Sequence, residues 1–153
     1  MIIGVDFDNT IVAQSHPYDD VTSPLQFLPG ARAGLHSLKA AGHTLILFSA
    51  RASRSLLFDE DLYAAILDPD FNLPPAGSSQ DVQIARFVQM IDFVERELPG
   101  IFAAVTSDKG RMDLFLDDKA QRLGYSGMSW EEVARNYGEP VEGLLEAVNV
   151  RAT

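Results

Sequence analysis

Short apolar runs alternate along the chain with segments whose apolar positions recur at helical spacing. The runs predict buried β-strands, because a strand covered on both faces carries apolar side chains at consecutive positions. The predicted strands are residues 2–7, 44–48, 101–105 and 114–116. Helical spacing predicts helices at residues 31–41, 54–68, 82–98 and 129–136, of which 82–98 has the clearest periodicity.

Local signals support several of these boundaries. Gly42 and the pair Pro99-Gly100 follow predicted helices and are typical helix stops. Ser129, with Glu132 three residues later, forms a capping box at the start of the last predicted helix. Residues 9–29 and 68–79 are rich in residues that favour turns, and we expect them to be loops.

Strands that alternate with helices predict a parallel sheet covered on both faces. We therefore expect an α/β fold, a Rossmann-like three-layer α/β/α sandwich with a mainly parallel sheet. The length of 153 residues suits one domain, residues 1–153, and the chain has no internal repeat or clear linker.

Composition narrows the chemistry. The chain has no cysteine, which excludes disulfides, thiolate catalysis and zinc–thiolate sites, and we expect a cytoplasmic protein. No apolar run reaches the roughly 20 residues of a membrane span, and the start of the chain has the pattern of a strand rather than of a signal peptide. The net charge of −10 argues against nonspecific binding to nucleic acid or anionic membranes. An anionic substrate would need local cations.

Polar side chains follow three of the four predicted strands. They are Asp6 and Asp8 after the first strand, Ser49 after the second, and Asp117 and Asp118 after the fourth, with Lys109 in the loop before the fourth. Because the carboxyl ends of parallel strands meet at one edge of a sheet, we expect these groups to converge there.

Such a cluster of carboxylates needs a divalent cation to offset their mutual repulsion. Oxygen ligands without His or Cys favour Mg²⁺, which commonly also binds a substrate phosphate. One carboxylate could then attack phosphorus, and a second could serve as general acid and later as base. Ser49 and Lys109 would hold the phosphoryl oxygens.

This arrangement resembles the haloacid dehalogenase-like (HAD) phosphatase superfamily over most of the chain. The motif Asp-x-Asp-x-Thr is present as DFDNT (residues 6–10), the apolar run ending in Ser or Thr as LILFS (45–49), and the paired aspartates as LFLDD (114–118). Lys109 best matches the lysine of the third motif, although Lys119 is an alternative. Asn9 stands where many members have Gly, and Asn tolerates unusual backbone angles.

The resemblance implies a role for each matching residue. Asp6 would be the nucleophile and Asp8 the acid/base. Mg²⁺ would be bound by Asp6, the backbone carbonyl of Asp8, and Asp117, with Asp118 supporting the metal site. The phosphate-binding set implied by the motifs is Ser49, Lys109, Asn9, Thr10, Ala50 and Arg51. A salt bridge is an equal alternative for Arg51.

The intervals where HAD enzymes insert cap domains are short here, so the resemblance implies a minimal-cap enzyme with no substantial cap domain. The substrate would be a small phosphorylated molecule, selected by the loops at residues 11–29 and 52–80. A partner subunit could cover the open site, so a homo-oligomer is left open.

Three functions compete. The leading interpretation is a Mg²⁺-dependent phosphomonoester hydrolase that acts through an aspartyl-phosphate on a small or terminal phosphate. A nucleic-acid-end or nucleotide phosphatase of the same superfamily is the second, and the acidic charge counts against nucleic acid. The third is a noncatalytic HAD-like module that binds a phosphoryl ligand. A response-regulator receiver fits less well, because Ser49 stands where its phosphoacceptor aspartate would be.

Overall fold

The computed structural model of the chain describes residues 1–13, 17, 20–52, 79–107, 110–117 and 129–141. The helix predicted at residues 54–68 lies outside the described residues. So do Lys109, Lys119 and Asp118.

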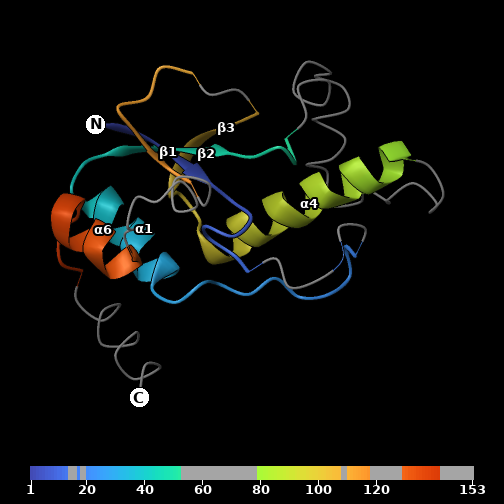
Figure 1. The fold of residues 1–153 in the computed structure, drawn as a ribbon, viewed down its shortest axis with the longest axis horizontal. Helices are drawn as coiled ribbons and strands as arrows, with labels where there is room; N and C mark the ends of the chain where they lie inside the picture. Colours follow the sequence, from blue (N-terminus) through green and yellow to red (C-terminus); the bar gives the residue numbers. More distant parts are fainter. Residues whose placement is uncertain (14–16, 18–19, 53–78, 108–109, 118–128, 142–153) are drawn as a thin grey trace, which may run out of the picture.

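The described strands form one parallel sheet in the order β3-β2-β1-β4 (Figure 1). The strands are β1 (Ile2–Asp6), β2 (Thr44–Phe48), β3 (Phe102–Thr106) and β4 (Leu114–Leu116). This confirms the predicted parallel α/β sheet. The prediction was exact for β2 and β4, while β1 is one residue shorter at its end and β3 begins and ends one residue later.

Three helices are described: α1 (Ala31–Ala40), α4 (Ser79–Glu97) and α6 (Trp130–Tyr137). The predicted cap of α6 is confirmed, because Ser129 Oγ accepts a hydrogen bond from the Glu132 backbone N–H at 3.2 Å. In Figure 1, α1 and α6 lie side by side, and these helices and α4 lie on one side of the sheet. The described part of the chain thus forms two layers, and the three-layer sandwich stays a prediction.

One hydrophobic core lies between the sheet and these helices. Alternate residues of the strands point into it, as the period of two in a β-strand requires. The strands contribute Ile3, Val5, Leu45 and Leu47, and the helices contribute Leu35, Leu38, Phe87, Met90, Val94, Trp130 and Val133. None of the described helices is long and apolar enough to cross a membrane.

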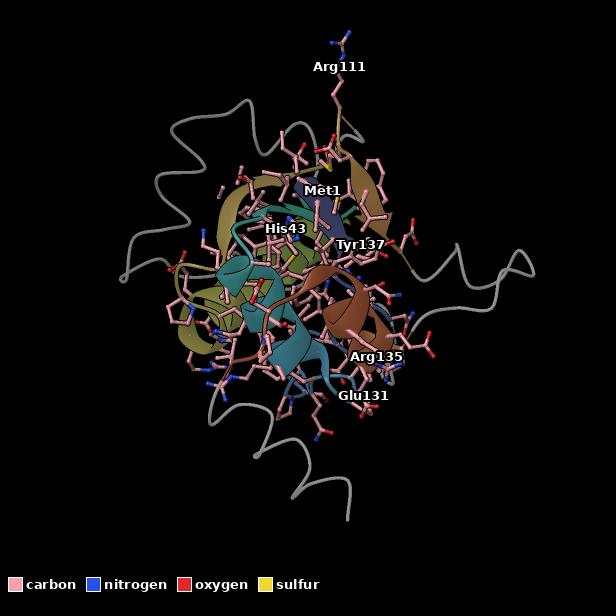
Figure 2. All side chains as sticks on the ribbon, turned by 90° about the vertical axis from the view of Figure 1, so that its left-hand side faces the viewer. Met1, His43, Arg111, Glu131, Arg135 and Tyr137 are labelled. Atoms are coloured by element: carbon pink, nitrogen blue, oxygen red, sulfur yellow. The ribbon has the colours of Figure 1, made fainter. Side chains whose placement is uncertain are left out.

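At the amino end of the sheet, His43 links the start of β1 to the last residue of α6. His43, just before β2, has Nδ1 at 3.1 Å from the Met1 nitrogen and Nε2 at 2.7 Å from the Tyr137 carbonyl oxygen. These three residues lie together in Figure 2. The predicted chemistry is at the opposite end, where the strands finish.

Candidate functional site

The order in which strands are added to the sheet changes side at β1, between β1 and β4, although all strands are parallel. From β1 the chain moves to β2 and then β3 on one side, whereas β4 pairs with the other side of β1. In open α/β sheets, the carboxyl ends of strands at such a switch point form the usual ligand site. Here Val5 pairs with Leu116, so the next residues along the two strands are Asp6 and Asp117. The structure therefore brings these two predicted site residues to neighbouring positions.

A tight turn follows β1 and carries Asp8, Asn9 and Thr10. The Phe7 carbonyl accepts hydrogen bonds from the backbone N–H groups of residues 10, 11 and 12 at 3.3, 2.9 and 3.2 Å. Asn9 has φ of 60° and donates its backbone N–H to the Val12 carbonyl at 2.7 Å. The left-handed conformation expected to be tolerated by Asn is the one it adopts.

The turn is also held from α6. Trp130 Nε1 donates a hydrogen bond to the Thr10 carbonyl at 2.7 Å. The Thr10 Oγ1 atom is buried, and within the described residues it has no hydrogen-bond partner. A helix 120 residues further along the chain thus fixes the backbone of the turn that carries Asp8.

Asp8 forms a two-point ion pair with Arg51. Arg51 Nε lies 2.8 Å from one carboxylate oxygen, and Nη2 lies 2.7 Å from the other. The side chains are 4% exposed for Arg51 and 19% exposed for Asp8, and Arg86 Nη2 lies 3.7 Å from Asp8 Oδ2. Two buried guanidinium groups therefore face the carboxylate predicted to act as acid/base.

The rest of the Arg51 guanidinium is held by α4. Its Nη1 donates to the Arg86 carbonyl at 3.1 Å and to Gln89 Oε1 at 2.8 Å. The group also lies over the Phe7 ring, 5.2 Å from its centroid. All three nitrogens are engaged, so the salt bridge that the sequence allowed for Arg51 is present in the structure, and phosphate binding by Arg51 stays a prediction.

Ser49 is buried and organises the turn that leads to Arg51. Its Oγ accepts a hydrogen bond from the Arg51 backbone N–H at 3.1 Å, and its carbonyl accepts one from Ala52 N–H at 3.1 Å. Its own N–H donates to the Thr106 carbonyl at 3.0 Å. Ala50, between Ser49 and Arg51, is exposed. The phosphate-binding roles of Ser49 and Ala50 stay predictions.

A second turn, residues 20–23, comes from the loop expected to select substrate. The Asp20 carboxylate accepts hydrogen bonds from the backbone N–H and hydroxyl groups of Thr22 and Ser23 at 2.6 to 3.1 Å. These bonds, led by that from the Ser23 hydroxyl, hold the pKa of Asp20 well below its ordinary value of 3.8. The carboxylate is therefore ionised at neutral pH and fixes the turn.

The described residues offer a limited set of metal ligands. Among them, no group of three or more His, Asp or Glu side chains could hold a metal ion. Both carboxylate oxygens of Asp8 accept hydrogen bonds from Arg51, and Asp118 lies outside the described residues. Mg²⁺ keeps several waters and needs only one or two protein carboxylates, so the site expected at Asp6, Asp117 and a backbone carbonyl stays a prediction.

Reasoning from the sequence gave no role at the site to Arg86, Gln89 or Trp130. Arg86 and Gln89 are three residues apart on α4, where the apolar pattern is otherwise strong. Two polar residues at this spacing, amid buried positions, could have indicated a buried polar contact. No pattern in the sequence would have paired Trp130 with Thr10.

Comparison with known proteins adds no relative. No protein-family model matches the chain, and neither the curated proteins nor the solved structures contain a significant match.

Proposed function

We propose that this protein is a Mg²⁺-dependent phosphomonoester hydrolase of the HAD type that forms an aspartyl-phosphate on Asp6. The observation that carries the proposal is the position of Asp6 and Asp117 at the switch point of the sheet, with Asp8 two residues beyond Asp6. Two carboxylates at neighbouring strand ends suit a cation, and a third, Asp8, is left to carry a proton.

The metal would be held by the carboxylates of Asp6 and Asp117 and by the backbone carbonyl of Asp8. When bound, Mg²⁺ supplies positive charge that offsets the repulsion between Asp6 and the phosphate dianion. The protein as a whole is acidic, so this charge has to be supplied locally.

Two transfers complete the proposed reaction. In the first, an Asp6 carboxylate oxygen bonds to phosphorus, the bond from phosphorus to the ester oxygen breaks, and Asp8 gives its proton to that oxygen. In the second, water gives a proton to the Asp8 carboxylate and bonds to phosphorus. The bond from phosphorus to Asp6 then breaks and inorganic phosphate leaves.

Arg51 has a defined part in this cycle. It binds both oxygens of Asp8 and so fixes the plane of the carboxylate. The ion pair corresponds to the stage at which Asp8 has lost its proton and awaits water. In this proposal Arg51 orients the acid/base instead of binding the phosphate.

Phosphate release from an aryl phosphate with and without Mg²⁺ tests the proposal. Asp6→Asn should lower kcat by at least about a thousandfold, because it removes the nucleophile. Asp92→Asn is the matched control, since Asp92 is an exposed aspartate on α4 and should leave activity unchanged. Equal activity in Asp6→Asn and wild type would overturn the mechanism. Inactive wild type across a panel of phosphorylated metabolites would favour the noncatalytic binding module.

A further inference from the structure

Gln89 on α4 joins the Asp8–Arg51 pair to the turn at residues 20–23. Its Oε1 accepts a hydrogen bond from Arg51 Nη1 at 2.8 Å, and its Nε2 donates one to the Ser23 carbonyl at 3.2 Å. The orientation of the amide follows from its partners, because a guanidinium only donates and a carbonyl only accepts. Both ends of the side chain are therefore used, and each reaches a different segment.

The contact with Arg51 sets which edge of the guanidinium faces Asp8. Gln89 and the Arg86 carbonyl both accept from Nη1, which leaves Nε and Nη2 directed at the two oxygens of Asp8. A guanidinium is a rigid plane, so fixing one nitrogen on α4 fixes the other two. Gln89 thus contributes to the position of Asp8 without touching it.

The contact with Ser23 extends the same network to the loop. Ser23 belongs to the turn ordered by the Asp20 carboxylate. Its carbonyl accepts the hydrogen bond from Gln89, which lies 66 residues further along the chain. One side chain on a helix therefore holds the candidate acid/base and a loop turn in a fixed relation.

We propose that Gln89 is a positioning residue of this enzyme: it orients Asp8 through Arg51 and fastens the turn at residues 20–23 beside the site. The proposal rests on the proposed hydrolase function. It goes beyond that function by assigning each contact of Gln89 an effect: the hydrogen bond with Arg51 affects kcat, and the hydrogen bond with Ser23 affects KM.

Two substitutions separate the roles. Gln89→Leu has similar size and removes both hydrogen bonds, so it should lower kcat about 10- to 100-fold and also raise KM. Gln89→Glu keeps an oxygen acceptor for Arg51 but cannot donate to the Ser23 carbonyl. It should keep kcat within about threefold of wild type and raise KM. Gln83→Leu and Gln83→Glu, at an exposed position of the same helix, are matched controls that should change neither constant.

A measurement that does not depend on activity accompanies the kinetics. The Arg51 Nε–H group, bound to Asp8, should give an NMR signal whose hydrogen exchange is slow in wild type, slow in Gln89→Glu and faster in Gln89→Leu. This result supports the proposal for the Arg51 contact even if wild type proves to have no phosphatase activity, which would overturn only the proposed function. Unchanged exchange and unchanged kcat in Gln89→Leu would overturn the role of Gln89. Equal loss of kcat in both Gln89 variants would overturn the assignment of kcat to the Arg51 contact.

Discussion

Asp8 and Arg51 meet across the carboxyl end of the sheet, with two nitrogen atoms of one side chain 2.7 and 2.8 Å from the two oxygens of the other. Asp8 comes from the turn after β1 and Arg51 from the turn after β2. Because neighbouring strands carry the two turns, the pair joins two loops that are 43 residues apart in the chain.

Breaking this pair should destabilise the protein strongly. Arg51→Met leaves the mostly buried Asp8 carboxylate without its main partner, and we expect a cost of about 3–5 kcal/mol in the free energy of unfolding. A double-mutant cycle with Asp8→Asn, measured by urea denaturation, should show coupling above about 1 kcal/mol. The exposed Arg96–Asp92 pair, 59% and 69% exposed, is the control and should couple by only about 0.3–0.5 kcal/mol. Equal coupling energies in the two pairs would contradict the burial of the Asp8–Arg51 pair.

The indole of Trp130 should be a structural constraint on the turn after β1. Trp130→Phe removes the hydrogen bond to the Thr10 carbonyl and should cost about 1–2 kcal/mol. Trp130 is the only tryptophan, so its indole N–H gives a single assignable NMR signal. That signal should exchange slowly with solvent and should shift when Mg²⁺ is added. Rapid exchange, as for an exposed indole, would be inconsistent with the hydrogen bond.

Gly34 is required for the contact between α1 and α6. In most helix interiors Gly→Ala adds about 1 kcal/mol of stability. At Gly34 the added Cβ would lie 2.6 Å from Trp130 Cε3, so we expect Gly34→Ala to destabilise by about 1–3 kcal/mol. Gly110→Ala is the control, since a Cβ there meets no atom within 4 Å. Thermal denaturation of both variants checks this, and a raised Tm for Gly34→Ala would contradict the packing.

His36 on α1 should make stability fall in mild acid. Burial, and secondarily the charge of Arg32, lower the pKa of His36 below its ordinary value of 6.5, and its Nε2 is buried without a hydrogen-bond partner within the described residues. The unfolded chain therefore binds a proton at a higher pH than the folded protein, so stability is lost as the pH falls below 6.5.

His36→Leu removes this titration. The urea midpoint should be measured for wild type and His36→Leu at pH 7.5 and pH 5.5. Going to pH 5.5 should lower the midpoint of wild type more than that of His36→Leu. An NMR titration of the His36 ring gives the pKa directly. An identical dependence on pH in both proteins would exclude His36 as a source of acid sensitivity.

Much of the described fold could be predicted from the sequence, because apolar runs and helical spacing are local properties. The strands at residues 44–48 and 114–116 were predicted exactly, and the helix cap at Ser129 was recognised from four residues. The convergence of Asp6 and Asp117 also followed from a general rule of parallel sheets.

The contacts within the site could not be predicted in the same way. The sequence left Arg51 between two roles, since its partner depends on which strands are neighbours. Gln89 bridges Arg51 and Ser23 only because α4 packs against both turns, and the indole of Trp130 reaches Thr10 across 120 residues. Such contacts depend on tertiary structure, which local spacing does not encode.

The interior position of β1 has a consequence for the order in which the protein can form during synthesis. Both strands that pair with β1 are made after it, and the Ile2 backbone N–H donates a hydrogen bond to the Asp113 carboxylate, 111 residues further along the chain. A nascent chain that has not passed β4 holds its first apolar strand with one edge unpaired. Completion of this sheet therefore depends on distant contacts, which slow folding and prolong the interval in which a chaperone could bind that edge.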